Sequence, residues 1–312
     1  GYGPAHTSFN PTESAISVAN VAGLVRRYPA NAAMGCDADA PQGEIGMCSS
    51  PAVAQGSVYV GTTSGDLVVR DAGTGSLQWS GHTGAPVYSS PAVADGVVYV
   101  GSDDFKLYAF DAAGITNCSG SPKICAPLWT ANTAGKVRSS PAVANGVVYL
   151  GSDDHKVYAF SAAGATNCSG SPKVCTPLWT TTAVSGVGRT PAIASGVVYV
   201  SGDQLYAFNA AGTTNCSGSP KVCTPLWTGT RGTGSTQTSP AVADGVVYVG
   251  VEVGASPVLD GFSAAGTTRC SGSPKICGPI WSGAVLDPVR TAPAIANGVV
   301  YINAGVLYAF DA

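Results

Sequence analysis

Short runs of alternating apolar and polar residues recur along the chain, and glycine, asparagine or aspartate ends each run. One unit contains apolar runs at 91–94 and 97–101, an alternating run at 106–110, and a fourth run ending at 127–130. Alternation with a period of two predicts β-strands, and no segment shows the period of an amphipathic helix. The pattern predicts an all-β protein.

A two-residue turn separates the first two runs of each unit. It is Asp95-Gly96 in the unit above, and its equivalents are Gln55-Gly56, Asn145-Gly146, Ser195-Gly196, Asp244-Gly245 and Asn297-Gly298. Asn-Gly and Asp-Gly suit the type I′ turn, which needs positive φ at both central residues. Each pair of runs is therefore predicted to form a tight antiparallel hairpin.

The phrase Ser-Pro-Ala-Val-Ala, or a close variant, occurs six times, with its proline at 51, 91, 141, 191, 240 and 293. Strand-forming repeats of about 40–50 residues are typical of propeller blades. Four antiparallel strands per unit predict a six-bladed β-propeller over residues 20–312. The blades are expected to start near 49, 89, 139, 189, 238 and 291.

The sixth unit ends at Ala312 after its third run, without a fourth. Residues 20–30 resemble a fourth strand, with Tyr28 in the place that tryptophan takes in the other units. We expect this strand to complete the last blade and close the ring, burying two open sheet edges. Residues 1–19 would form a lead-in or an assembly arm. Five blades or an open solenoid are alternatives that leave residues 20–30 unexplained.

One aromatic residue occupies the fourth run of each unit, which predicts packing between neighbouring blades rather than ligand binding. These residues are Trp79, Trp129, Trp179, Trp227, Trp281 and Tyr28.

Ten cysteines fall into five close pairs, and four pairs lie in near-copies of one insertion. The pairs are Cys36 and Cys48, Cys118 and Cys125, Cys168 and Cys175, Cys216 and Cys223, and Cys270 and Cys277. The six-residue spacing within the four insertions and the scarcity of histidine disfavour zinc. Local disulfides are predicted, and they imply a secreted, extracellular or cell-surface protein. Gly1 would then lie near a processed N-terminus, unless the sequence has been trimmed.

Charge excludes one large class of partners. Of the 312 residues only 11% are charged, and the formal net charge is −3. A nucleic-acid binder is excluded, because several phosphates could not be neutralised. No apolar run reaches the roughly 18 residues of a transmembrane helix, so no transmembrane segment is expected.

The repeat resembles the pyrroloquinoline-quinone-like (PQQ-like) β-propeller family. Asp71-Ala-Gly-Thr-Gly-Ser-Leu-Gln-Trp79 is similar to the family's Asp-x-x-Thr-Gly-x-x-x-Trp signature, and the recurring Ser-Pro-Ala-Val-x-x-Gly-x-Val-Tyr-Val-Gly supports this. The segments 5–11 and 20–24 are similar to the start of secreted bacterial members. The resemblance implies the fold but not the function, since the repeat serves quinone dehydrogenases, outer-membrane assembly lipoproteins and other secreted proteins.

The chain departs from the quinone-binding members of that family. It has no adjacent cysteines, and its length allows six blades where those dehydrogenases have eight. A second quinone-using class, with six blades, uses a catalytic histidine with arginine partners. Here only His155 lies in a turn within a blade, whereas His6 is in the lead-in and His82 in a connection. No cofactor is therefore expected.

Two sets of polar residues are expected near the mouth of the central channel. One set precedes each first strand and could hold an anion or a partner's carboxylate: Tyr88, Arg138, Arg189, Gln237 and Arg290, with Cys48 in the first blade. The other comprises the turn aspartates Asp66, Asp103, Asp104, Asp153, Asp154 and Asp203. The arginines could equally pair with these aspartates. No calcium loop is present, so the aspartates are expected to cap their own turns, and no metal is predicted.

The four cysteine insertions are expected on the face opposite that mouth. Their near-identity favours a role common to all blades, such as lateral packing, although resistance to proteases is an alternative. Asn117, Asn167 and Asn215 match the glycosylation pattern, with cysteine in the middle position.

The sequence thus favours a non-enzymatic secreted propeller that serves as an extracellular structural or protein-binding module. Its partners would be another protein, further copies of itself, or a cell-surface or matrix component. A small-ligand or quinone-binding oxidoreductase that uses the channel mouth is the alternative.

Overall fold

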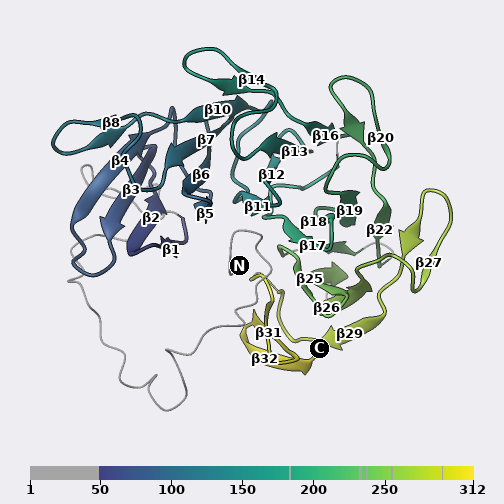
Figure 1. The fold of residues 1–312 in the computed structure, drawn as a ribbon. Helices are drawn as coiled ribbons and strands as arrows, with labels where there is room; N and C mark the ends of the chain where they lie inside the picture. The colour runs from purple at the N-terminus through teal and green to yellow at the C-terminus, as the bar shows by residue number, and fades with distance from the viewer. Residues whose placement is uncertain (1–48, 183, 232–233, 237, 254–255, 290) are drawn as a thin grey trace.

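The alternating runs form strands that gather into six sheets, arranged in an arc around a common centre (Figure 1). The computed structural model describes residues 49–182, 184–231, 234–236, 238–253, 256–289 and 291–312. All regular structure in these residues is β-strand or turn, and they contain no helix of the length and apolarity that a membrane crossing requires.

Four strand positions recur from the centre of the arc to its rim. The first strands are β1 (Ala52–Ala54), β5 (Ala92–Ala94), β11 (Ala142–Ala144), β17 (Ala192–Ala194), β24 (Ala241–Ala243) and β30 (Ala294–Ala296). The second strands are β2 (Ser57–Gly61), β6 (Val97–Ser102), β12 (Val147–Ser152), β18 (Val197–Ser201), β25 (Val246–Val253) and β31 (Val299–Ala304). The third strands are β3 (Asp66–Asp71), β7 (Lys106–Asp111), β13 (Lys156–Ser161), β19 (Leu205–Asn209), β26 (Ser256–Ser263) and β32 (Val306–Asp311). The fourth strands are β4 (Leu77–His82), β10 (Trp129–Asn132), β16 (Trp179–Thr181), β22 (Trp227–Gly229) and β29 (Trp281–Ala284).

Within a sheet these strands pair antiparallel in chain order. In the second sheet Ala92 pairs with Tyr99, Tyr99 with Ala109, and Ala109 with Trp129. The turn between its first two strands has φ of 49° at Asp95 and 77° at Gly96, the positive values that a type I′ turn requires. The turn chemistry read from the sequence thus sets the register of each sheet.

Two-stranded hairpins extend four of the sheets. These rim hairpins are β8 (Cys118–Ser119) with β9 (Ile124–Cys125), β14 (Cys168–Ser169) with β15 (Val174–Cys175), β20 (Cys216–Ser217) with β21 (Val222–Cys223), and β27 (Cys270–Ser271) with β28 (Ile276–Cys277). Each follows the third strand of one repeat but pairs in parallel with the fourth strand of the repeat before it, as β9 does with β4. They lie along the outer rim of the arc (Figure 1).

The strand number of the predicted blades therefore needs correction. Four strands per blade were expected, but sheets 1–4 have six, because each takes in the hairpin of the next repeat. Sheet 5 has five strands, including the short β23 (Ser235–Thr236), and sheet 6 has three. No rim hairpin among the described residues pairs with either of these last two sheets.

Closure of the ring stays a prediction. The expected closing strand at 20–30, Tyr28 and the pair Cys36 and Cys48 all lie outside the described residues. Within the described residues, sheets 1 and 6 form the two ends of the arc and share no strand pairing.

The core lies between the sheets, where each apolar cluster joins two neighbouring repeats. One such cluster combines Trp179 and Tyr149 of sheet 3 with Phe208 and Val198 of sheet 4. Tyr149 is 2% exposed and its hydroxyl donates a 3.0 Å hydrogen bond to the carbonyl of Ala210 in the next repeat. Burial raises the pKa of Tyr149 to about 12, so this hydroxyl stays a donor. A series of such contacts between neighbouring sheets, called seams below, holds the arc together.

Candidate functional site: the channel mouth and the rim hairpins

Arg138 at the expected channel mouth is already paired. Its guanidinium donates two hydrogen bonds to Asp103, of 3.0 and 2.8 Å, and lies 5.4 Å from the ring centre of Tyr88. Lys136 is 3.2 Å from the same carboxylate. Burial alone would raise the pKa of Asp103, but the hydrogen bonds and charges of Arg138 and Lys136 hold it below its ordinary value. Arg138 therefore holds the segment that precedes β11 against the turn between β6 and β7.

Arg189 occupies the equivalent linker of the next repeat, but its guanidinium has no carboxylate partner in the described part of the chain. It is half-buried, and burial lowers its pKa. It borders a cavity of about 370 Å³, lined by Ser152, Asp153, His155, Gly186, Val187, Gly188 and Arg189. An unpaired guanidinium beside a cavity is suited to binding an anionic group.

The predicted ring of three arginines is only partly described. Gln237 and Arg290 lie outside the described residues. Of the other members, Arg138 is occupied by Asp103 and stacks on Tyr88, whereas Arg189 faces the cavity. Equivalent positions in the repeat thus have different surroundings.

The turn aspartates mainly fasten their own turns. Asp104 accepts a 2.5 Å hydrogen bond from Tyr108, Asp154 one of the same length from Tyr158, and Asp203 one from Tyr206. Asp66 contacts His82. The described residues contain no group of three side chains that could hold a metal ion. These carboxylates hold the turn between the second and third strands against the strand that follows.

Two histidines fall within the described residues, and they differ in partners. His82 pairs with Asp66 at the end of β4. His155 is exposed, has a φ of 67° in its turn, and borders the Arg189 cavity. His155 is therefore the histidine that could reach a ligand in this cavity.

The rim hairpins contain the four disulfides that the cysteine spacing predicted. These join Cys118 to Cys125, Cys168 to Cys175, Cys216 to Cys223, and Cys270 to Cys277. Disulfides of this kind are compatible with an oxidising, extracellular environment. In each case the backbone carbonyl of the hairpin lysine accepts a hydrogen bond from the fourth strand of the preceding repeat, as Lys221 does from Thr180 at 3.0 Å.

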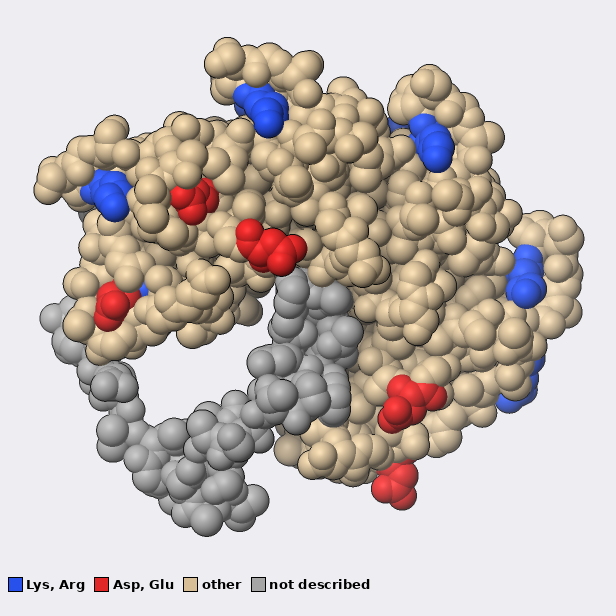
Figure 2. Space-filling model, viewed as in Figure 1, with Lys and Arg blue, Asp and Glu red and all other residues tan. Residues whose placement is uncertain are grey.

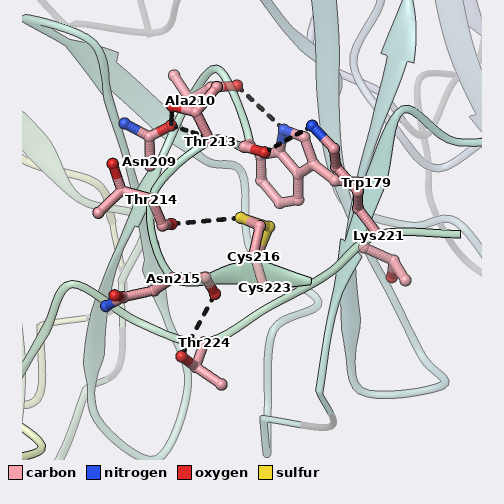
Figure 3. The surroundings of a disulfide bond; sticks show 12 residues. Trp179, Asn209, Ala210, Thr213, Thr214, Asn215, Cys216, Lys221, Cys223 and Thr224 are labelled. Atoms are coloured by element: carbon pink, nitrogen blue, oxygen red, sulfur yellow. Dashed lines mark hydrogen bonds between the residues drawn. A yellow bond between two sulfur atoms is a disulfide. The ribbon is translucent and has the colours of Figure 1, made fainter. Parts of the chain in front are cut away.

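Figure 3 shows how one rim hairpin reaches the preceding repeat. The indole nitrogen of Trp179 donates a 3.0 Å hydrogen bond to the carbonyl of Ala210, at the base of the hairpin. Thr213 closes the same base by donating to the side-chain oxygen of Asn209. The ammonium of Lys221 donates to the carbonyl of Gly212 at 3.1 Å. The hairpin is thereby anchored both to its own repeat and to its neighbour.

Sequence reasoning missed the glycines against which the tryptophans pack. These are Gly114, Gly164, Gly212 and Gly266, each with positive φ. A Cβ on Gly212 would lie 2.2 Å from the Cδ1 atom of Trp179, so no side chain fits there. The sequence does contain a pattern that could have indicated this contact. The same glycine recurs at the start of every insertion, and each one follows the tryptophan of the preceding repeat.

The asparagines of the glycosylation pattern have a structural place in the hairpins. Asn117, Asn167 and Asn215 adopt positive φ of 58–60°, a conformation that asparagine tolerates better than most residues. Each side-chain amide donates to a proline carbonyl ten residues later, as Asn215 does to Pro225 at 3.0 Å. They remain exposed, and their modification stays a prediction.

Sheet 5 contains a buried carboxylate, paired with a partly exposed arginine, that the sequence did not signal. Asp260 is fully buried and accepts hydrogen bonds from Arg231 at 2.9 Å and from Ser282 at 2.6 Å. It stands where the neighbouring repeats have Tyr108, Tyr158 and Tyr206. Burial raises the pKa of Asp260, while Ser282 and Arg231 oppose that rise. One repeat thus replaces a tyrosine–aspartate contact by an ion pair.

Comparisons with known proteins agree with this architecture. Residues 32–116 match the family described as outer membrane protein assembly factor BamB, which confirms the resemblance to PQQ-like repeats over that part of the chain. The crystal structure of BamB from Moraxella catarrhalis is similar, with a TM-score of 0.52 at 14% identity over 86% of each chain. The computationally designed Ika8 protein has a TM-score of 0.63 at 12% identity over 86% of this chain and 71% of its own. No curated protein matches the sequence.

The comparisons show a PQQ-like β-propeller fold. At identities of 12–14%, the similarity to the two solved structures supports a conclusion about the fold only. Function has to be inferred from the surfaces that this chain presents.

Proposed function

We propose that the protein is a secreted, non-enzymatic β-propeller that serves as an extracellular structural and protein-binding module. The matching family is that of an outer membrane protein assembly factor, which is consistent with a role in binding proteins. The disulfides support a place outside the reducing cytoplasm.

One observation carries the proposal: the rim presents the same surface four times. Each rim hairpin exposes, at the same position, a β-branched aliphatic side chain next to a lysine. The aliphatic residues are Ile124, Val174, Val222 and Ile276, with exposures of 45%, 37%, 37% and 47%. The lysines are Lys123, Lys173, Lys221 and Lys275, and Figure 2 shows the basic side chains spaced along the rim.

Repetition of a surface favours a partner that can contact several hairpins together. Linked weak contacts gain affinity because each later contact forms at high effective concentration. The four hairpins are held by disulfides and by the fourth strands, so their spacing is fixed. Such a surface suits a protein partner or further copies of the same chain.

Native mass spectrometry of the protein taken from its source tests the proposal. We expect the chain in complex with a protein partner or with further copies, and without stoichiometric quinone or calcium. Replacing Ile124, Val174, Val222 and Ile276 together by serine should abolish the complex while the thermal unfolding midpoint stays nearly unchanged. Ile115→Ser is the matched control, because Ile115 is 74% exposed but occurs in one hairpin only. A complex that survives the fourfold change would contradict the proposal.

The Arg189 cavity favours a second candidate function, the binding of a small anionic ligand at the channel mouth. Its support is a cavity of about 370 Å³ lined by His155 and by Arg189, whose guanidinium has no carboxylate partner among the described residues. A quinone-dependent oxidoreductase would be one version of it. An ultraviolet–visible spectrum of the purified protein would reveal a bound quinone, and Arg189→Gln should then release it. Metal analysis tests separately for stoichiometric calcium.

A further inference from the structure

The turn between β12 and β13 repeats the turn between β6 and β7. Residues 101–104, with the sequence Gly-Ser-Asp-Asp, recur unchanged as residues 151–154. In both turns the second aspartate accepts a 2.5 Å hydrogen bond from a tyrosine of the following strand. In both, the amide of the first aspartate donates to the preceding connection, at 3.0 and 2.9 Å. The two turns are thus held alike, and their first aspartates, Asp103 and Asp153, can be compared directly.

Two cations from the next connection cover Asp103. Arg138 donates one hydrogen bond to each of its carboxylate oxygens, and the ammonium of Lys136 lies 3.2 Å from one of them. Beneath these side chains Asp103 is only 8% exposed. A guanidinium that binds both oxygens of a carboxylate is a strong and geometrically specific contact.

Glycine replaces both cations beside Asp153. Gly186 and Gly188 stand fifty residues after the lysine and the arginine that cover Asp103. A Cβ on Gly188 would lie 3.5 Å from the Oδ1 atom of Asp153, so this glycine faces the carboxylate. Asp153 is exposed, and it lines the cavity of about 370 Å³ together with the two glycines. The cavity therefore lies where the preceding repeat has its two cationic side chains.

The charge of Asp153 is only partly balanced. Hydrogen bonds to Asp103 are the main cause of the raised pKa of Arg138, and the charge of Asp153 adds to that rise. Within the part of the chain that the structure describes, however, Asp153 forms no ion pair, whereas Asp103 forms two. The turn that accommodates two cations at Asp103 thus leaves room for one at Asp153.

We propose that this cavity binds the guanidinium of an arginine side chain from a protein partner, with Asp153 accepting two hydrogen bonds as Asp103 does from Arg138. The inference rests on the proposed protein-binding function and names one contact of the partner. Arginine suits the site better than lysine, because its planar fork of donors matches a carboxylate. Gly186, Gly188 and His155 are exposed, so the cavity is open to another molecule.

Arg189 distinguishes this site from an anion site, because it lines the same cavity. Its positive charge opposes the entry of a second guanidinium but would favour an anion. Arg189→Gln should therefore strengthen the binding of a guanidinium at least twofold, and it should weaken the binding of a carboxylate.

An NMR titration of the isotope-labelled full chain tests the site with N-acetyl-arginine methylamide as the probe. We expect saturable shifts at the amides of Gly186 and Gly188, and at least threefold weaker binding in Asp153→Asn. Asp95→Asn, which removes the same charge from an exposed turn, is the matched control and should leave binding unchanged. Equal shifts with N-acetyl-citrulline methylamide, which has the same shape without the charge, would overturn the proposal. So would binding of N-acetylglycine in place of the arginine probe.

Gly188→Arg supplies the guanidinium from within the chain. The φ of Gly188 is not in the left-handed region, so an arginine there is not strained by the backbone. We expect the thermal unfolding midpoint to rise and the shifts caused by the probe to disappear. Adding Asp153→Asn should remove the part of the rise that exceeds the rise in Gly188→Gln. Additive effects of the two changes would overturn the contact with Asp153.

The complex isolated from the source separates this inference from the proposed function. Gly188→Arg should reduce the amount of partner bound at least threefold, because its own side chain fills the cavity. A complex that is lost on the fourfold rim change but survives Gly188→Arg would keep the protein-binding function and overturn the arginine contact.

Discussion

The seam between sheets 3 and 4 and the seam between sheets 5 and 6 join the same kinds of strands, but only the first includes a rim hairpin. Trp179 in the first is 1% exposed and hydrogen-bonded to Ala210. Trp281 in the second is half-buried, although its ring contacts Phe310 at 5.2 Å and Tyr248 at 6.3 Å. Aromatic packing thus forms without the hairpin, and the hairpin adds burial and backbone hydrogen bonds.

Removing the tryptophan from each seam should give the largest difference. We expect Trp179→Ala to lower the free energy of unfolding by about 4 kcal/mol, because a large, fully buried side chain and its hydrogen bond are lost. Trp281→Ala should cost roughly half as much, because part of that ring is already in water. Chemical denaturation of the two variants measures this, and equal losses would show that the hairpin contributes little to burial.

Filling the space between glycine and tryptophan should have the next largest effect. Gly212→Ala places a methyl group 2.2 Å from Trp179 at a φ of +61°, so we expect a loss of about 3 kcal/mol from crowding and backbone strain. Gly146→Ala is the control, because Gly146 has a φ of +73° but no atom within 4 Å of the added Cβ. That control should cost only about 1 kcal/mol. If the two variants unfold at the same denaturant concentration, the packing account is wrong.

Breaking a hairpin disulfide should have a moderate effect. Replacing Cys216 and Cys223 together by alanine opens a short loop, for which chain entropy predicts a loss of about 2 kcal/mol. Because this hairpin contacts Trp179 through its base, the double change should also expose that ring and shift its fluorescence to longer wavelength. The same change at Cys118 and Cys125 should act alike on Trp79. An unshifted spectrum would show that the disulfide does not affect the packing of the tryptophan ring.

Acidification should give the smallest effect, at the channel mouth. The pKa of Asp103 is held below its ordinary 3.8, so the stabilisation that it provides is present above that value and is lost as the pH falls through the lower folded value. Arg138 is half-exposed, so we expect Asp103→Asn to cost about 1 kcal/mol or less at pH 7 and nothing in strong acid.

The periodic parts of the fold were accessible from the sequence because their signals are local. Alternation, the Asp95-Gly96 turn and its equivalents, and the tryptophan of each unit predicted the strand order and the aromatic core. The cysteine spacing predicted the four hairpin disulfides, since cysteines so close in sequence are readily joined across a hairpin.

The rest could not be predicted because it depends on contacts between repeats. One example is the pairing of β9 with β4 of the preceding repeat. This contact is non-local, and the residues of the insertion alone do not predict it. The unequal roles of Arg138 and Arg189 arise from neighbours across a turn, and equivalent places in a repeat do not guarantee equivalent partners. Asp260 shows the same limit, because its partner Arg231 lies in a connection with no periodic signal.

The parallel pairing of each rim hairpin with the preceding repeat has a consequence for synthesis on the ribosome. The fourth strand of sheet 1 ends at His82, but its outer partner is Ile124–Cys125, in the following repeat. Each of sheets 1–4 must wait for residues of the next repeat before its outer edge is covered, so a nascent chain exposes an unfinished edge while these four sheets are being made. Premature termination at the end of any of these four repeats would leave that edge open to aggregation.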